Sequence, residues 1–393
     1  MQIITDIRQK FTEIFGDTNG ARLFHAPGRV NIIGEHIDYN GGFVLPCALD
    51  VGTYVLVRPN RGGVMRFVSA DFGGTAEVAL DEVAYDAAYS WANYPLGVVH
   101  QMQQDKALRG AKLTGFDALF MGNLPRGAGL SSSASVQVVM AAALNTLFGL
   151  GYETMELALL AQRAENQFCG VNCGIMDQFA VAMAKKDMAI YLNCDTLEYR
   201  HVPLELGDYG IVIMDTNKRR KLNESRYNER RAECEVALAD LQIAHDITQI
   251  AQLTPDVFGG GRWVSSEVNR KRARHVVSEN HRVGLAVAAL EAWNLAALGE
   301  LLVKSHNSLR DDYEVSCAEL DIIVEAAVNH SACIGARMTG AGFGGCAIAL
   351  VRTDAAEDFM AQVAGDYERA VGHAASMYLQ ASGGGVREIC DAR

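Results

Sequence analysis

The spacing of apolar residues along the chain predicts several helices. Residues 134–149 (ASVQVVMAAALNTLFG) are rich in Ala, Leu and Met and contain no proline, so this segment is expected to form a long buried helix. Residues 155–168 predict a second helix, around which Glu156 and Glu165 point in different directions. Further helices are expected at 1–16, at 89–104, directly after Asp177, and through most of 225–330.

Shorter apolar runs bounded by glycine and proline predict strands. Residues 22–26 form one such run, which is expected to break at Pro27-Gly28. The β-like runs at 53–57 and 65–68 are separated by turn residues at 60–63, which predicts that the two runs pair as a hairpin. Other strands are expected at 43–49, 116–121, 211–215 and 347–351.

The length of the chain and a change in its pattern predict two domains. At 393 residues, the chain is longer than one hydrophobic core usually serves. Near residue 205 the pattern changes to a strand, a basic run at 218–221 and a long helical region. We therefore expect an N-terminal domain at 1–205 and a C-terminal domain at 206–393.

Composition narrows the possible partners. The formal net charge of -12 argues against nucleic acid, whose phosphates need clustered Lys and Arg. No apolar run reaches the length of a membrane span, and the N-terminus lacks the apolar core of a signal peptide. The nine cysteines are odd in number and scattered, which is typical of reduced thiols. The sequence thus predicts a cytoplasmic protein that binds small molecules, with no membrane or nucleic-acid partner.

A glycine- and serine-rich segment at 123–135 leads into the first long helix. Gly127 and Gly129 permit backbone conformations that side chains disfavour, and three serines follow them. Unpaired N–H groups and the helix dipole make such a helix start a site for anions. A plain helix entry capped by serines is the simpler alternative. The segment is not a P-loop, because no lysine follows the glycines.

A second segment, at 27–42, is interrupted by glycine and proline and is rich in hydrogen-bonding side chains. It holds Arg29, Glu35, His36 and Asp38 together with two asparagines, a set that suits a polar ligand with many hydroxyls. By itself, Glu35-His36-x-Asp38 is open to three interpretations: a metal site, a salt-bridged turn or a sugar clamp. The apolar run that follows is expected to anchor this segment to a sheet.

Other candidate residues also have plain structural interpretations. Glu165 could reach a cation or lie on a solvated helix face, and Asp177 could be only a carboxylate at a helix start. Residues 340–345 satisfy the dinucleotide fingerprint G-x-G-x-x-G, but a strand follows them where that fingerprint needs a helix. We therefore expect a glycine turn packed against a ligand loop, or a tight hairpin.

Three of these segments occur in an order that resembles the GHMP kinases: P-G-R-V-N-I-I-G-E-H at 27–36, P-R-G-A-G-L-S-S-S-A at 125–134 and G-A-G-F-G-G at 340–345. The first narrows the resemblance to the galactokinase family, whose signature G-R-V-N-L-I-G-E-H-T-D-Y-N it follows closely. The resemblance extends from about residue 10 to about residue 380. It implies an α+β fold of two domains that meet at a cleft, the N-terminal one like ribosomal S5 domain 2 and the C-terminal one of the GHMP kinase α/β type.

The resemblance also implies a role for each motif. The catalytic pair would be Arg29 and Asp177, and Mg²⁺ would be held by Ser133 and Glu165, whose oxygen ligands suit that ion. Sugar contacts would come from Glu35, His36, Asp38 and Tyr227. ATP would be bound by Gly127, Ala128, Gly129, Leu130, Ser131, Ser132 and Ser133.

Two positions depart from the family pattern. Ile37 replaces the threonine of E-H-T-D, and Ala341 replaces the second glycine of G-G-G-F-G-G. Neither change removes a catalytic group. Because Ile37 lies between two expected sugar contacts, it is expected to bear on the choice of sugar.

The implied activity is transfer of the γ-phosphoryl group of ATP to the C1 hydroxyl of D-galactose, by a monomer that uses Mg²⁺. One alternative is a kinase for N-acetylgalactosamine or another related sugar. Another is a sugar- and ATP-sensing regulator without catalysis. The complete run Ser131-Ser132-Ser133-Ala134-Ser135, together with Arg29 and Asp177, favours the enzyme.

Overall fold

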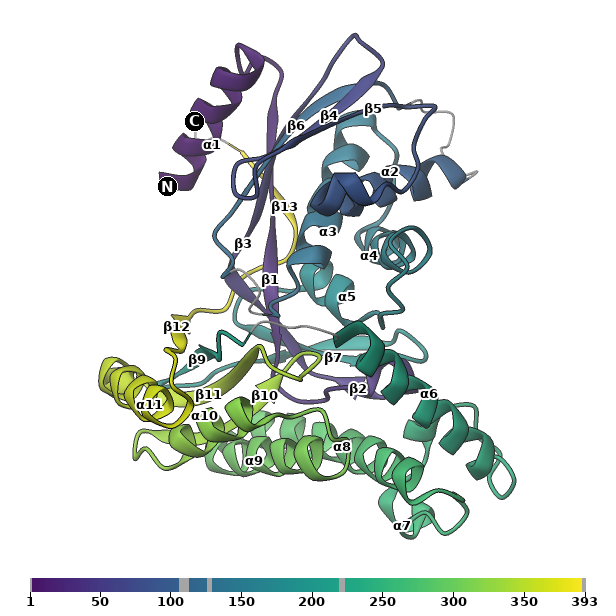
Figure 1. Ribbon diagram of the computed structural model, residues 1–393, viewed down its shortest axis with the longest axis vertical. Coiled ribbons are helices and arrows are strands. Elements are labelled where there is room, and N and C mark those ends of the chain that lie inside the picture. Colours follow the sequence, from purple (N-terminus) through teal and green to yellow (C-terminus); the bar gives the residue numbers. More distant parts are fainter. Residues whose placement is uncertain (1, 106–112, 126–128, 219–222, 391–393) are drawn as a thin grey trace.

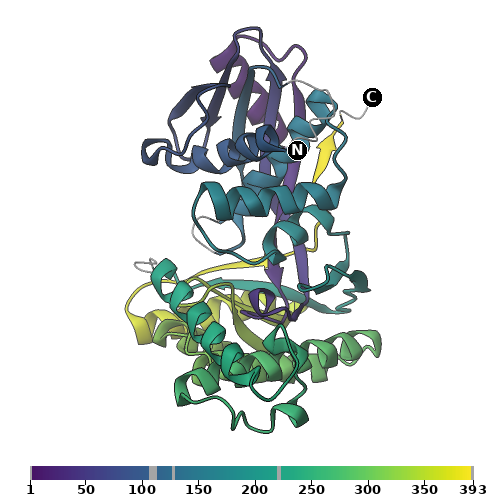
Figure 2. The same cartoon turned by 90° about the vertical axis from the view of Figure 1, so that its right-hand side faces the viewer.

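The computed structural model describes residues 2–105, 113–125, 129–218 and 223–390. Two bodies lie one above the other, and the chain crosses between them several times (Figure 1). The bodies remain distinct when the molecule is turned by 90° (Figure 2). No helix in these described ranges is long and apolar enough to cross a membrane.

The upper body is built on a six-stranded sheet with the order β13-β1-β3-β6-β4-β5. All its pairs are antiparallel except β4 with β6, which is parallel. Helices cover one face of this sheet and α1 covers the other (Figure 1). Its strands are β1 (Arg22–Asn31), β3 (Pro46–Pro59), β4 (Val64–Ser69), β5 (Thr75–Ala79), β6 (Phe116–Gly122) and β13 (Arg387–Ile389). Its helices are α1 (Gln2–Phe15), α2 (Asn93–Gln104), α3 (Ser132–Phe148), α4 (Thr154–Arg163) and α5 (Met176–Met183).

The lower body holds a four-stranded antiparallel sheet with the order β10-β11-β9-β12, packed on helices. A three-stranded sheet, β2-β7-β8, lies at about the same height, and its buried residues belong to the same hydrophobic core (Figure 1). The strands are β2 (Phe43–Val44), β7 (Met188–Asn193), β8 (Tyr199–Pro203), β9 (Tyr209–Asp215), β10 (Cys333–Thr339), β11 (Cys346–Arg352) and β12 (Ser376–Gln380). The helices are α6 (Asn223–Leu241), α7 (Pro255–Phe258), α8 (Glu267–Glu291), α9 (Leu295–Asp311), α10 (Ala318–Val328) and α11 (Ala356–Val371).

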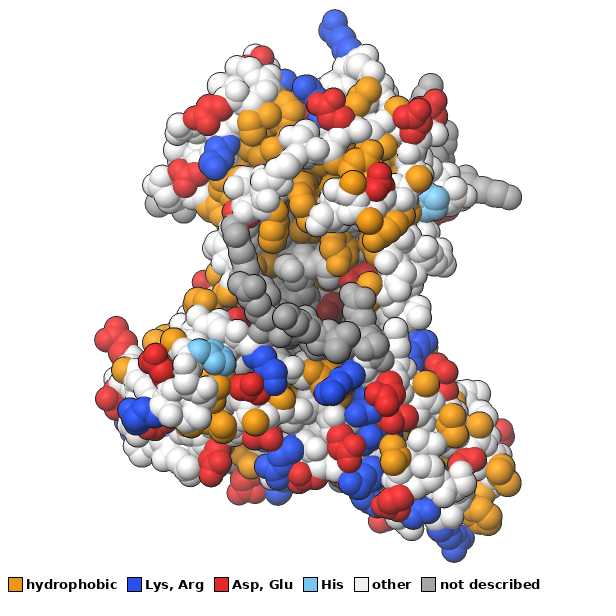
Figure 3. Space-filling view, viewed as in Figure 1, with side chains coloured by type: hydrophobic (Ala, Val, Ile, Leu, Met, Phe, Trp, Pro, Cys, Tyr) orange, Lys and Arg blue, Asp and Glu red, His pale blue; other side chains and the backbone are white. Residues whose placement is uncertain are grey.

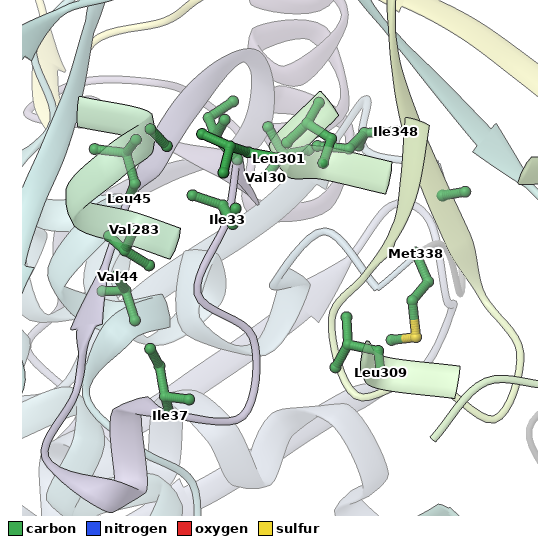
Figure 4. Close-up of a cluster of buried hydrophobic side chains, with 14 of the residues drawn as sticks. Val30, Ile33, Ile37, Val44, Leu45, Val283, Leu301, Leu309, Met338 and Ile348 are labelled. Carbon is green, nitrogen blue, oxygen red and sulfur yellow. The ribbon is translucent and has the colours of Figure 1, made fainter. Parts of the chain in front are cut away.

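Short helical turns complete the secondary structure. The segment η3 (Ala164–Phe168) is a π-helix that continues directly from α4. The 3₁₀ turns are η1 (Asp38–Asn40), η2 (Ala87–Ala92), η4 (Ile250–Gln252) and η5 (Thr353–Ala355). One hydrophobic cluster runs from the end of β1 into the lower body, so that Val30, Val44 and Ile348 belong to the same core (Figure 4).

Two of the predicted strand arrangements are wrong. The runs at 53–57 and 65–68 do not pair as a hairpin, because β6 lies between β3 and β4 and pairs with both. The hairpin partner of β4 is β5 instead. Strand β1 does not break at Pro27-Gly28 but continues through a bulge between Pro27 and Arg29. The bulge lets the strand accommodate a residue without an N–H.

The glycine-rich turn at 340–345 joins the antiparallel strands β10 and β11 and packs against the loop after β1, where Gly340 N–H donates to Glu35 Oε1. A strand follows it, as expected, so it does not form a dinucleotide site. The division at 205/206 stays a prediction. The C-terminal residues contact both bodies. Strand β12 pairs with β9 in the lower body, and strand β13 then pairs with β1 in the upper body.

Candidate active site

A cavity of about 660 Å³ lies where the upper and lower bodies meet. The space-filling view shows the molecule narrowing between the two bodies (Figure 3). The cavity receives side chains from the end of β1 and the loop after it, from η3, from the start of α5, from α6 and from the turn after β10. Its walls include seven of the residues assigned from the sequence: Arg29, Glu35, His36, Asp38, Glu165, Asp177 and Tyr227.

Arg29 and Asp177 form a two-pronged ion pair at one wall. Arg29 Nε donates to Asp177 Oδ1 at 2.8 Å, and Nη2 donates to Oδ2 at 2.9 Å. The remaining Nη1 donates to the Gly129 carbonyl at 2.9 Å, so the guanidinium also holds the middle of the glycine-serine segment. Burial alone would lower the pKa of Arg29, but the neighbouring Asp177 carboxylate raises it. Arg29 is therefore permanently charged.

Ser131 provides a further contact to Asp177. Its hydroxyl donates to Asp177 Oδ2 at 2.7 Å, and its backbone adopts the left-handed conformation with φ of 61°. It makes no side-chain cap at the start of α3. The alternative of a simple serine cap therefore does not describe Ser131. Gly127 and Ala128, which the sequence also assigned to ATP, lie outside the described residues.

Glu35 and His36 connect the loop after β1 to the turn after β10. Glu35 Oε1 accepts from the Thr339 hydroxyl at 2.8 Å and from the Gly340 N–H at 2.9 Å. His36 Nε2 lies 3.2 Å from the Ala341 carbonyl, which can only accept, so this nitrogen carries the proton. Burial lowers the pKa of His36 to about 3, so the imidazole is neutral.

Asp38 and Tyr227 complete the part of the cavity that was expected to hold the sugar. Burial, followed by the charges of Asp177 and Glu35, raises the pKa of Asp38 to about 7. Gly174 packs so closely on Asp38 that a Cβ there would overlap the carboxylate. The Tyr227 ring lies 5.6 Å from the His36 ring, and burial keeps its hydroxyl protonated by raising its pKa well above 10.0.

Glu165 is buried rather than solvated. The π-helix η3 turns its side chain inward, and only 6% of the residue is exposed. Gln178 Nε2 donates to Glu165 Oε2 at 2.7 Å, and Ser133 also hydrogen-bonds to this carboxylate. Burial, followed by the charge of Asp177, raises the pKa of Glu165 to about 7. Glu156, in contrast, takes part in the capping box at the start of α4.

Of the two departures from the family pattern, only Ala341 lines the cavity. The Ile37 side chain is fully buried and lies near Val44 and Val283 in the hydrophobic core (Figure 4). The expectation that Ile37 bears directly on the choice of sugar therefore lacks a structural basis. Its neighbours in sequence reach the cavity, while Ile37 anchors the loop between them.

Three family models match this chain. The galactokinase galactose-binding signature matches residues 9–59, the GHMP kinases N terminal domain matches 93–185, and the GHMP kinases C terminal model matches 286–369. The galactokinase of Bacillus subtilis (strain 168) is 46% identical over 388 residues, which cover 98% of both chains. The chain belongs to the galactokinase family of GHMP kinases. It is an ATP-dependent sugar kinase.

Solved structures agree with this membership of the galactokinase family. The crystal structure of Lactococcus lactis galactokinase complexed with galactose matches with a TM-score of 0.95 and 43% identity, covering 98% of this chain and 100% of the other. The Methanococcus jannaschii mevalonate kinase matches with a TM-score of 0.67 at 18% identity, covering 92% and 98% of the two chains, which shows the fold alone. The predicted α+β two-domain fold of the GHMP kinases is confirmed.

The cavity of this galactokinase-family chain also contains residues that the sequence did not single out. Tyr39 donates its hydroxyl to His36 Nδ1 at 2.8 Å, and it stands within the same signature segment. Cys173 and Gly174 come from residues 170–174, just before Asp177, where glycines interrupt the helical pattern. The glycines at 170 and 174 were the available signal for this segment. Asn228 has no such signal, because it is one polar residue of a polar helix.

Proposed function

We propose that this chain transfers the γ-phosphoryl group of ATP to the C1 hydroxyl of D-galactose, giving galactose 1-phosphate and ADP. The observation that carries the proposal is the two-pronged Arg29–Asp177 pair in the same cavity as Glu35 and Asp38. Asp177 is a base that can accept the proton of a sugar hydroxyl. The permanently charged Arg29 beside it can stabilise the anionic phosphoryl group. The nearby carboxylates suit recognition of several sugar hydroxyls.

In the proposed reaction, the C1 oxygen attacks the γ-phosphorus in line while its proton passes to Asp177. The bond from the γ-phosphorus to the β–γ bridging oxygen breaks, and ADP leaves. Arg29 holds the Asp177 carboxylate by two hydrogen bonds and offsets the negative charge that develops on the transferring group. Ser131 and Arg29 together orient the Asp177 carboxylate, since both donate to its oxygens.

ATP is proposed to bind along residues 127–133, at the start of α3. Ser131 precedes a helix of 17 residues, and Ser132 and Ser133 are its first two residues. The N–H groups and the dipole at such a helix start favour phosphate oxygens. The buried Ser135 hydroxyl donates to the Ala26 carbonyl at 2.9 Å and so ties this helix start to β1. This contact supports a fixed distance between the phosphate site and Arg29, which lies further along the same strand.

Mg²⁺ is proposed to be held by the Ser133 hydroxyl and the Glu165 carboxylate. The residues fit the ion, because the described part of the chain offers buried Glu165 no ion-pair partner and burial raises its pKa. Groups of three or more His, Cys, Asp or Glu able to hold a metal do not occur among the described residues. A site with few protein ligands is typical of Mg²⁺, which keeps waters and binds phosphate oxygens. When bound, Mg²⁺ would neutralise charge on those oxygens.

Glu165→Gln is expected to weaken the apparent affinity for Mg²⁺ and to lower turnover, with excess metal restoring part of the activity. The variant removes the negative charge of one of the few proposed protein ligands of Mg²⁺, but it keeps a side-chain oxygen and the shape of the side chain. Activity should be titrated with Mg²⁺ at saturating ATP and galactose. Glu156→Gln is the matched control, since Glu156 lies at a helix cap. Identical Mg²⁺ titrations for Glu165→Gln and the native protein would contradict the assignment.

The carboxyl of Asp38 predicts a dependence of stability on pH. Its pKa is raised from 3.8 to about 7, so between these values the folded protein holds a proton that the unfolded chain has lost. The free energy of unfolding of the native protein, relative to Asp38→Asn, should therefore fall as pH rises from about 4 to about 7 and then level off. Urea unfolding of both proteins without sugar measures this difference. A difference that stays constant over that range would show that Asp38 titrates normally.

The proposed substrate is tested with purified protein, ATP and a panel of sugars, by following ADP. Rapid ADP formation with galactose supports the proposal. A preference for N-acetylgalactosamine would make the chain a kinase of that related sugar. Sugar binding without ADP formation would instead indicate a regulator. We also retain as proposals a monomeric enzyme in the cytoplasm, with galactose and ATP as its small-molecule partners and no nucleic-acid or membrane partner.

A further inference from the structure

Helix α8 in the lower body holds the loop that carries Glu35 and His36. Its buried face presents polar side chains to the backbone of residues 34–43, and three hydrogen bonds join the two segments. These are Gly34 N–H to Glu279 Oε1 at 3.0 Å, His275 Nε2 to the Glu35 carbonyl at 3.1 Å, and Phe43 N–H to Asn280 Oδ1 at 2.8 Å.

Glu279 is a fully buried anion, and each of its oxygens is occupied. Oε1 accepts from Gly34 N–H and from the Ser305 hydroxyl at 2.6 Å, and Oε2 accepts from Arg282 Nε at 2.7 Å. Burial by itself would raise the pKa of Glu279, but the charge of Arg282 is the largest of the effects that together outweigh burial, and the pKa is lowered to about 2. A buried carboxylate with donors on both oxygens is held in one orientation, so Gly34 is fixed to a rigid point on α8.

The hydrogen bonds of His275 define its tautomer. The Glu35 carbonyl only accepts, so His275 Nε2 carries the proton, and Nδ1 lies 3.0 Å from the Ser308 hydroxyl oxygen. Burial lowers the pKa of His275 to about 4, which keeps the ring neutral. His275 is fully buried and stands one helical turn before Glu279. The two side chains therefore lie on the same face of α8 and hydrogen-bond to consecutive loop residues, Gly34 and Glu35.

The loop needs such support because its backbone is unusual. Gly34 has φ of 105°, and His36, a residue with a side chain, has φ of 62°. A Cβ at Gly34 would lie 2.8 Å from the Phe43 carbonyl and 3.0 Å from Val283 Cγ2. Backbone of this kind persists only where neighbouring groups determine it. Glu35 and His36 both reach the cavity from this stretch.

We propose that His275 and Glu279 are positioning residues for sugar binding. Neither lines the cavity, and both act through the loop backbone to hold Glu35 and His36 in place. This inference rests on the proposed function of the loop as the sugar site. Displacing a binding group by about 1 Å is enough to weaken its contacts strongly. Losing a support on α8 should therefore affect galactose and leave ATP almost untouched.

The experiment compares three histidine variants. His275→Phe keeps a ring but removes the N–H to Glu35, and should raise KM for galactose by about tenfold to a hundredfold with KM for ATP within about twofold. His275→Gln places an amide N–H near the lost imidazole N–H and should restore most of the affinity. His330→Phe is the matched control, because His330 is also buried and accepts from the Ala332 N–H far from the loop. It should leave both KM values unchanged.

Further variants separate the possible failures. If His275→Phe does not fold, Glu279→Gln tests the same loop, and a KM for galactose equal to that of His330→Phe would overturn the inference. Equal effects of His275→Phe on both KM values, or no rescue by His275→Gln, would also overturn it, since they indicate a general loss of structure. Asp38→Ala tests the proposed function separately. If it impairs galactose binding while the α8 variants do not, only the positioning role fails.

Discussion

The Asp177→Asn variant is expected to turn over roughly 10²–10⁴-fold more slowly than the native protein while still binding galactose. Asparagine keeps the size of the side chain and one oxygen acceptor but removes its basicity. A sugar hydroxyl is a poor nucleophile at neutral pH, so the transition state without a base must carry the proton on the attacking oxygen. The loss should therefore appear in kcat and much less in the Kd for galactose.

The contacts of Asp177 define the controls for this experiment. Arg29 donates to both oxygens, so the amide of asparagine would face one guanidinium N–H with another donor. If this contact displaces Arg29, the displacement lowers kcat as well, and the result then looks like the loss of a base. The Kd for galactose and the melting temperature should be measured beside kcat. Near-normal turnover would reduce Asp177 to a carboxylate at the start of α5, which was the plainer interpretation of its position in the sequence.

Local patterns predicted much of the fold because they depend on neighbours in sequence. The apolar run at 134–149 forms helix α3, and the glycine turn at 340–345 forms the hairpin between β10 and β11. The pairing of β4 was missed because its parallel partner, β6, comes almost 50 residues later in the chain. A turn signal at 60–63 indicates where the chain reverses but not which strand it will meet.

The candidate site was predictable by motif, but its geometry was not. Glu165 lies on a helix whose regular period leaves its direction open, and the π-helix η3 changes that period just where the residue stands. Ile37 sits between residues that reach the cavity, yet its side chain points into the core. Both outcomes depend on packing against segments far away in sequence. The hydrogen bonds from α8 to the loop have the same origin.

Galactose is expected to be preferred over glucose by roughly 10³-fold or more in kcat/KM. The two sugars differ only in the configuration of the hydroxyl at C4. The carboxyl groups of Glu35 and Asp38 face the cavity beside the neutral His36, and a carboxyl oxygen that loses its sugar-hydroxyl partner there is left unpaired in a buried site. Such a loss costs about 1–3 kcal/mol, and more for a charged group. A site built to hydrogen-bond a substrate hydroxyl therefore discriminates steeply.

Asp38→Ala tests this discrimination, because Asp38 reaches the cavity and packs on Gly174. The variant should lower kcat/KM for galactose and narrow the gap between galactose and glucose, since the site then has fewer groups to leave unpaired. Galactosamine and N-acetylgalactosamine extend the comparison to C2. Ile37→Thr serves as a control that restores the family residue, and its buried position predicts an unchanged sugar ranking. Glucose phosphorylated as well as galactose by the native protein, or unchanged rates and ranking in Asp38→Ala, would mean that the loop is not the sugar site.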